Sequence, residues 1–186
     1  MRKKIFPILA IFVFFVVVLV GQMTLSGGYT AAQKTSLSDG KIKAYEELFN
    51  ELKLETTKGS KFNLSKLDQE IVILNFWASW CRPCVSEFKA LNALIDSMPE
   101  EKLLVIGINN DDEEALKNIK KIEKEYDLKF ESVKDEASDI ASKYRINNIP
   151  ASVVYHKGKV IHFVNKEFDF NNSEFVSLLK SKLSKD

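Results

Sequence analysis

The chain has 186 residues, 45% of them hydrophobic, with 13 phenylalanines and a formal net charge of +1. This length suits one globular domain with a sizeable core, and the composition is too apolar for a disordered chain. Arg2, Lys3 and Lys4 precede the first acidic residue, Asp39, and no segment is basic enough to indicate nucleic acid as a partner.

The N-terminal segment is typical of a membrane anchor or an export signal. Its three basic residues precede an apolar run, residues 5–20, which is interrupted only by Pro7 and extends to Leu25. This length is close to the ~20 residues of a membrane-spanning helix, and basic residues before such a helix stay in the cytoplasm. We expect residues 1–25 to be a single anchor in the cytoplasmic membrane, with the chain that follows on the extracytoplasmic or periplasmic side. The small residues Thr30-Ala31-Ala32 leave cleavage and release of the domain as the alternative.

A tether and a folded domain follow the apolar segment. Residues 26–42 are rich in Gly, Ser, Thr and Ala and predict a flexible linker, so the domain is expected at residues 43–186. Apolar residues at helical spacing predict a short helix at its start, and alternating residues around Gly59 predict a β-hairpin. The helical positions are Tyr45, Leu48, Phe49 and Leu52.

Strands and helices then alternate along the chain. Near-continuous apolar runs predict buried strands at residues 71–77 and 103–108. A helix is predicted at residues 82–98, and a second helix is predicted to be capped by Asp111 and Asp112. The inner face of this second helix is expected to hold Leu116, Ile119, Ile122 and Tyr126.

The last third of the chain adds two predicted helices and a hairpin. A short strand is expected at residues 130–133, and a hairpin at residues 152–155 and 160–164. The helix before the hairpin is expected to pack through Ala137, Ile140, Ala141 and Tyr144, and the last helix through Phe175, Val176, Leu179 and Leu183. This order of elements predicts an α/β sandwich, a mixed central sheet flanked by helices.

The only two cysteines lie in the motif Cys81-Arg82-Pro83-Cys84, between a buried strand and a helix. A helix N-terminus stabilises a thiolate, and Arg82 adds a positive charge beside it. Pro83 suits the first helical turn, where a missing N–H costs nothing. We therefore expect Cys81 to attack a disulfide and Cys84 to resolve the mixed disulfide, so that the pair forms a redox-active disulfide.

Metal and haem sites fit this sequence poorly. Zinc would need two further ligands, and His156 and His162 follow Cys84 by more than 70 residues, far beyond a zinc-finger loop. Val85 follows Cys84 where a c-type haem attachment site has histidine. We therefore expect no metal and no cofactor, and we expect both histidines on a solvated hairpin.

The segment from Leu74 to Cys84, Leu-Asn-Phe-Trp-Ala-Ser-Trp-Cys-Arg-Pro-Cys, with Glu87 and Phe88 after it, resembles the TlpA/ResA-like branch of the thioredoxin superfamily. The resemblance covers roughly residues 52–183 and implies a thioredoxin-like sandwich with an N-terminal hairpin. It also implies a strand–helix insert around residues 130–144. Members of this branch are exported, membrane-anchored thiol reductants, often serving cytochrome c maturation.

The resemblance also implies a substrate-facing loop. Pro150 takes the place of a cis-proline that faces the active-site sulfurs, and Ile149 would offer its backbone to a bound peptide. The branch usually has Gly where this chain has Asn148 and Thr where it has Ala151, so contacts after the proline are expected to differ.

Three residues near the motif need separate discussion. Trp80 and Glu87 each have two possible roles, and Asn75 replaces a residue with a known role in thioredoxin. Trp80 either covers the site or simply packs, and Asn75 stands where thioredoxin has a buried Asp. A neutral amide cannot accept the proton of Cys84, so Glu87, three residues after Cys84, is the candidate substitute. Its alternative role is that of a favourable anion in the first turns of the helix.

The sequence thus predicts a thiol–disulfide oxidoreductase concerned with cell redox homeostasis. Its catalytic residues are Cys81, Cys84, Glu87 and Pro150, and its substrate-binding residues are Trp80, Arg82, Pro83 and Ile149. The expected partners are disulfide-containing exported proteins, an integral-membrane thiol electron donor and the membrane itself. A disulfide-forming oxidase of the same fold and a non-catalytic peptide-binding module or chaperone are the alternatives. A peroxiredoxin is disfavoured because no Thr-x-x-Cys motif is present.

Overall fold

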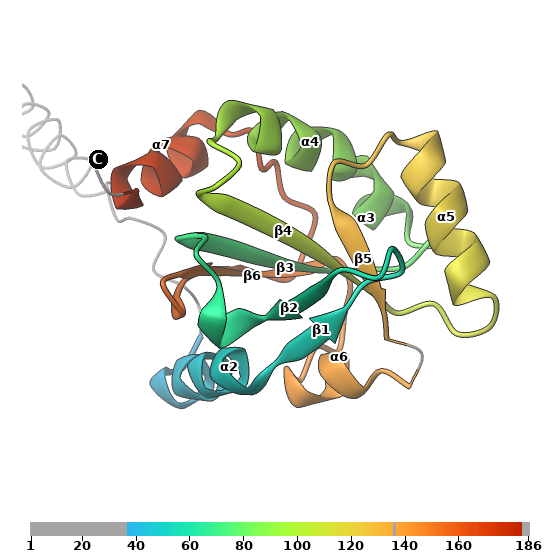
Figure 1. Cartoon of the computed structure of the whole chain (residues 1–186), viewed down its shortest axis with the longest axis horizontal. Coiled ribbons are helices and arrows are strands. Elements are labelled where there is room, and N and C mark those ends of the chain that lie inside the picture. Colours follow the sequence, from blue (N-terminus) through green and yellow to red (C-terminus); the bar gives the residue numbers. More distant parts are fainter. Residues whose placement is uncertain (1–36, 136, 184–186) are drawn as a thin grey trace, which may run out of the picture. The chain divides into compact units, whose positions relative to one another are not determined.

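The computed structural model describes residues 37–135 and 137–183 (Figure 1). The predicted anchor, residues 1–25, and most of the predicted linker lie outside this range. In the described part, no helix combines the length and apolarity that crossing a membrane requires.

A five-stranded mixed sheet forms the centre of the domain, in the order β5-β4-β3-β6-β7 (Figure 1). Neighbours β3, β4 and β5 run parallel, whereas β6 is antiparallel to both β3 and β7. The bounds are β3 Ile71–Trp77, β4 Leu103–Asn109, β5 Glu131–Lys134, β6 Ala151–His156 and β7 Lys159–Val164. All seven residues of β3 are buried because helices or loops cover both faces of the sheet. The predicted mixed α/β sandwich is confirmed.

Helices and a hairpin cover the two faces. One face carries α3 Arg82–Ser86, α4 Phe88–Ser97, α5 Ala115–Glu125 and α7 Ser173–Lys182. The other carries α2 Asp39–Glu51, the hairpin β1 Lys53–Glu55 with β2 Lys61–Asn63, the 3-10 turn η2 Leu64–Lys66, and α6 Asp139–Lys143. Because side chains alternate along a strand, Ile73 and Trp77 of β3 join the first core, and Leu74 and Phe76 join the second.

The start of the domain agrees with the sequence pattern. Tyr45 and Phe49 are the buried residues of α2, and Gly59 turns the hairpin with a φ of 89°. The helix α2 begins at Asp39, so residues 39–42, assigned to the linker from composition, are helical.

The helix predicted at residues 82–98 is interrupted. The structure divides it at Glu87, whose N–H donates to the carbonyl of Cys84, three residues back, at 3.3 Å. The chain resumes as α4 with Phe88, Leu91 and Leu94 buried. The interruption places Glu87 at the junction of two helices, a feature that apolar periodicity cannot show.

The prediction for the start of α5 is wrong. The helix begins at Ala115, without a side-chain cap, after Glu114 at a φ of 57°. Asp111 does not cap it because its carboxylate bonds to Ser79 instead. The buried residues are Ala115, Ile119 and Ile122, whereas the predicted inner-face residues Leu116 and Tyr126 are exposed.

Two further expectations need correction. Ala137 is exposed, because α6 begins only at Asp139 and Asp135 caps it, accepting the N–H groups of Ile140 and Ala141 at 3.0 and 2.9 Å. His156 and His162 are partly buried rather than solvated. The His162 ring packs on aromatic side chains of the segment after β7, and burial lowers its pKa.

Candidate active site

The strand β3 leads directly into the cysteine motif. After Trp77 the chain turns through residues 78–80, and Asp111 holds this turn from the end of β4. Its Oδ1 accepts the N–H of Ser79 at 2.9 Å and the Ser79 hydroxyl at 3.1 Å. Asn109 supports Asp111 in turn, donating from Nδ2 at 3.2 Å. The turn before Cys81 is therefore fixed by a buried carboxylate, that of Asp111, whose predicted role was to cap a helix.

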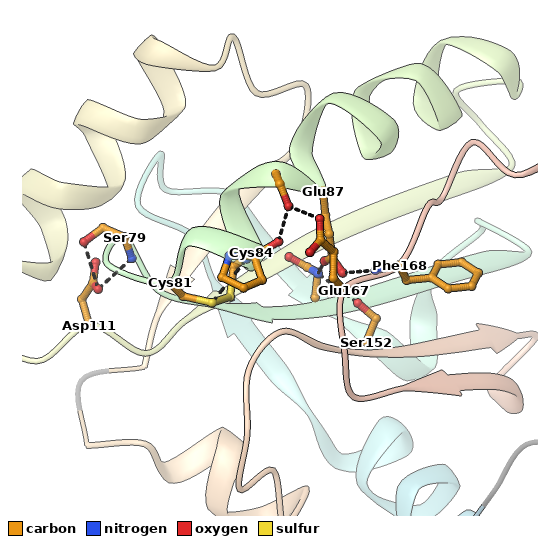
Figure 2. The surroundings of a disulfide bond; sticks show 11 residues. Ser79, Cys81, Cys84, Glu87, Asp111, Ser152, Glu167 and Phe168 are labelled. Atoms are coloured by element: carbon orange, nitrogen blue, oxygen red, sulfur yellow. Dashed lines mark hydrogen bonds between the residues drawn. A yellow bond between two sulfur atoms is a disulfide. The ribbon is translucent and has the colours of Figure 1, made fainter.

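Cys81 and Cys84 form a disulfide at the N-terminus of α3 (Figure 2). Cys81 is the N-cap residue, and its Sγ accepts the N–H of Cys84 at 3.3 Å. Cys84 is fully buried, whereas Cys81 retains 5% exposure. Because only Cys81 reaches the surface, an incoming disulfide can meet its sulfur and not that of Cys84. Pro83 lies in the first turn of α3, as predicted.

Glu87 lies in a buried polar network beneath the motif (Figure 2). Its Oε1 accepts the N–H of Phe168 at 2.6 Å, and its Oε2 lies 3.4 Å from Nδ2 of Asn75. The same Nδ2 donates to the Ser152 hydroxyl on β6 at 2.9 Å. The network therefore joins β3, β6, the α3–α4 junction and the segment after β7.

Burial governs the proton affinity of Glu87. Its side chain is only 3% exposed, and desolvation raises the pKa of Glu87 to about 8, against a smaller opposing effect of its two hydrogen bonds. A carboxyl group with this pKa is largely protonated at neutral pH and can exchange a proton with a thiol, whose ordinary pKa is about 8.5.

Asn75 can bond Glu87 in either protonation state. Its Oδ1 is buried and has no hydrogen-bond partner among the described residues. Half a turn of the amide would present this oxygen to the hydroxyl of a protonated Glu87, while the orientation shown presents N–H to the carboxylate. A buried Asp at this position would instead add a second acid.

The Ile149–Pro150 peptide bond is cis, as the resemblance implied. Pro150 is buried, and Ile149 packs against the core cluster that contains both cysteines. Ala151 follows as the first residue of β6 and pairs with Phe76 of β3. The loop before β6 thus lies against the strand that carries the motif. The expected substrate contact of the Ile149 backbone stays a prediction.

The surface beside Cys81 is aromatic and charged. Trp80 is 71% exposed and Arg82 is exposed, so neither packs into the core. Both line a groove of about 460 Å³ between α3 and α5, to which the exposed Tyr126 also belongs. Tyr126 continues the helical stripe of α5, a pattern that predicts burial, yet its side chain is exposed in this groove.

The residues that sequence reasoning missed are Asp111 as the support of the turn, Ser152, and the backbone of Phe168. They are separated from the motif by 25 to 90 residues, so no local pattern connects them with it. The signals that could have found two of them are a polar residue shortly after the predicted strand 103–108, Asp111, and a polar first residue in the predicted strand 152–155, Ser152.

A CxxC disulfide at a helix N-terminus after the central strand, with a cis-proline directly before the neighbouring antiparallel strand, defines a thioredoxin-fold redox protein. A model of the AhpC/TSA family matches residues 46–164, and the chain belongs to this family.

Relatives within the family sharpen this assignment. The chain is 34% identical over 105 residues to a thiol-disulfide oxidoreductase named ResA from Bacillus cereus, a match covering 56% of this chain and 60% of that relative. It is 30% identical over 148 residues to ResA of another strain, covering 78% of this chain and 84% of the relative. The crystal structure of StoA from Bacillus subtilis shares the fold, with a TM-score of 0.57, 23% identity, and 70% and 94% of the two chains covered. The predicted TlpA/ResA-like assignment is confirmed, and the protein is a thiol–disulfide oxidoreductase.

Proposed function

We propose that the protein works as a reductant of disulfides in exported proteins. The observation that indicates the direction of electron transfer is that the structure stabilises a Cys81 thiolate only weakly. Arg82 is exposed to solvent, α3 has only five residues, and Cys84 supplies one N–H at 3.3 Å. A strong oxidant needs a strongly stabilised thiolate, because that stabilises its reduced form.

The size of these effects supports the proposal. An exposed charge contributes about 1 kcal/mol or less, which is roughly 20 mV for a two-electron couple. A shift of this size is too small to turn a thioredoxin-like potential of about −270 mV into the roughly −120 mV of an oxidant.

In the proposed cycle, the Cys81 thiolate attacks a substrate disulfide and displaces one substrate sulfur as a thiolate, which water protonates. Glu87 as carboxylate then takes the proton of Cys84, and the Cys84 thiolate attacks the Cys81 sulfur. The second substrate sulfur leaves as a thiolate and takes up a proton, so the substrate has gained two electrons and the Cys81–Cys84 pair, now a disulfide, has lost them. Restoring the dithiol requires two electrons and two protons, which we assign to an integral-membrane thiol carrier.

Substrate contacts are proposed at the surface around Cys81. Trp80 and Arg82, the exposed sequence neighbours of Cys81, would contact the substrate, and the Ile149 backbone with Pro150 would bind an extended segment of it. Apocytochromes c are candidate substrates because their C-x-x-C-H cysteines must be reduced before haem attaches.

The reduction potential is the deciding measurement. Equilibration of the full protein with glutathione or dithiothreitol buffers should give a value below about −200 mV, together with reduction of insulin disulfides. Cys81→Ser should abolish insulin reduction. A potential above about −180 mV, with oxidation of reduced proteins faster than reduction, would instead support the oxidase. Normal binding of peptides with no turnover would support the binding module.

The location of the domain is a separate proposal. The basic and apolar character of residues 1–25 supports an anchored protein with its catalytic domain outside the cytoplasmic membrane. Protease added to intact spheroplasts should digest the domain, and full protection would contradict the proposal. Recovery of the domain in the soluble fraction would favour cleavage near Ala32.

A further inference from the structure

The segment between β7 and α7, residues 165–170, crosses the α3–α4 junction and is here called the strap. Its Phe168 ring packs against His162 of β7 and Phe175 of α7, with centroid distances of 5.2 and 5.1 Å, and against Phe170 of the strap itself at 5.0 Å. The strap is therefore seated on β7 and α7 through an aromatic cluster.

Two neighbouring residues of the strap bond two neighbouring residues of the junction (Figure 2). The Ser86 hydroxyl lies 2.5 Å from Oε1 of Glu167, and the N–H of Phe168 donates to Oε1 of Glu87 at 2.6 Å. Ser86 also lies 2.8 Å from the carbonyl of Pro83, inside the cysteine motif. The Glu167 carboxylate is thereby held beside the buried acid of the active site, while its own side chain is exposed.

Among the described residues, Glu167 is the charged side chain that affects the pKa of Glu87. Its negative charge raises the pKa of Glu87, in addition to the larger effect of burial. The other elements packed against Glu87 contribute the neutral Asn75 from β3, with Ser152 of β6 behind it, and the thiol of Cys84 from α3 when the disulfide is reduced.

We propose that Glu167 is a positioning residue of the redox reaction: held by Ser86 beside Glu87, its charge moves the resolving step, in which Cys84 attacks a mixed disulfide, to higher pH. This inference rests on the proposed role of Glu87 as acceptor of the Cys84 proton. Glu167 touches neither substrate nor sulfur in this scheme, and it acts through Glu87 alone.

The test is the pH profile of the resolving step in the full-length protein. Reduced protein attacks 5,5′-dithiobis(2-nitrobenzoate) through Cys81, releasing one thionitrobenzoate, and the attack of Cys84 on this mixed disulfide releases the second. Glu167→Gln removes the charge and keeps an acceptor for Ser86, so the profile should move to lower pH. The rate of the second release at pH 7 should then rise roughly two- to threefold, since removing one exposed charge changes an ionised fraction by about this factor.

Matched variants separate the charge from its position. Glu167→Asp keeps the charge, so its pH profile should stay closer to that of the wild type than the profile of Glu167→Gln does. Ser86→Ala keeps the charge but removes the hydroxyl that holds it, so its profile should shift to lower pH by less than that of Glu167→Gln. Glu174→Gln removes another exposed carboxylate, at the start of α7, and should leave the profile unchanged. A wild-type profile in Glu167→Gln, or an equal shift in Glu174→Gln, would overturn the inference.

The role of Glu87 is tested in the same assay. Glu87→Gln should flatten the profile in this range, and Glu167→Gln should then have no further effect. If Glu87→Gln retains the wild-type profile, the proposed role of Glu87 fails and the inference falls with it. If Glu87→Gln flattens the profile and Glu167→Gln does not move it, only the inference about Glu167 fails. Carbon-13 NMR titration of the Glu87 carboxyl group in the oxidised protein supplies an independent readout. Its titration midpoint is expected to lie at lower pH in Glu167→Gln than in the wild type.

Discussion

Replacing Glu87 with Gln should make the oxidised protein more stable at alkaline pH. Gln has nearly the shape of a protonated Glu, and its amide oxygen can still accept the N–H of Phe168. It cannot ionise, so it never places a charge in the buried network between Asn75 and the α3–α4 junction.

The sign follows from proton binding. The pKa of Glu87 is about 8 in the folded protein and 4.5 when the chain is unfolded, so between these pH values the folded protein binds more protons. Stability contributed by protonated Glu87 is therefore fully present below pH 4.5 and is lost as the pH rises through 8. At about 1.4 kcal/mol per pKa unit, the wild-type protein should lose about 3 to 4 kcal/mol from this group between pH 5 and pH 8.

Urea unfolding of the oxidised proteins at pH 5, 6, 7 and 8 measures the effect as a difference between wild type and Glu87→Gln. The difference should grow with pH in favour of the variant, while other titrating groups cancel. Glu113→Gln, at an exposed position in the loop before α5, should follow the wild type at every pH. A difference that stays constant from pH 5 to pH 8 would show that Glu87 ionises as an ordinary surface carboxyl, and the reasoning from burial would be refuted.

Two further predictions concern the cysteines and the sheet. Cys84→Ser should accumulate mixed disulfides with substrate proteins on non-reducing gels, and Cys81→Ser should not, because only Cys81 reaches the surface; faster alkylation of Cys84 than of Cys81 in the reduced protein would reverse the assignment. Gly107→Ala should destabilise the domain by about 1 to 3 kcal/mol in urea unfolding, because a Cβ there would lie 2.7 Å from both Oγ of Ser132 and Nε1 of Trp77. An unchanged midpoint would mean that β4 and β5 can separate without penalty.

The strands and the reactive motif are readable from the sequence because their signals are local. The apolar run at residues 71–77 predicts a strand buried on both faces, and β3 has these bounds. The two cysteines are three positions apart, with Arg82 and Pro83 between them, and this spacing indicates their redox chemistry without reference to any distant residue. Both signals come from residues that are adjacent in the sequence: the apolar run reflects the periodicity of the backbone, and the motif reflects the reactivity of its own side chains.

Only the tertiary structure decides what surrounds the sulfurs. Asp111 has the residue type and place of a helix cap, yet it bonds Ser79 because the end of β4 lies beside the turn that leads to Cys81. Glu87 has the place of a surface anion on a continuous helix, yet the helix is interrupted there and the strap covers it. Burial and long-range hydrogen bonds determine a carboxyl group's proton affinity, and both arise from contacts between residues far apart in the chain. The sequence by itself therefore determines the reaction class, whereas the packing of the strap and the strands against Glu87 determines the pKa of its carboxyl group.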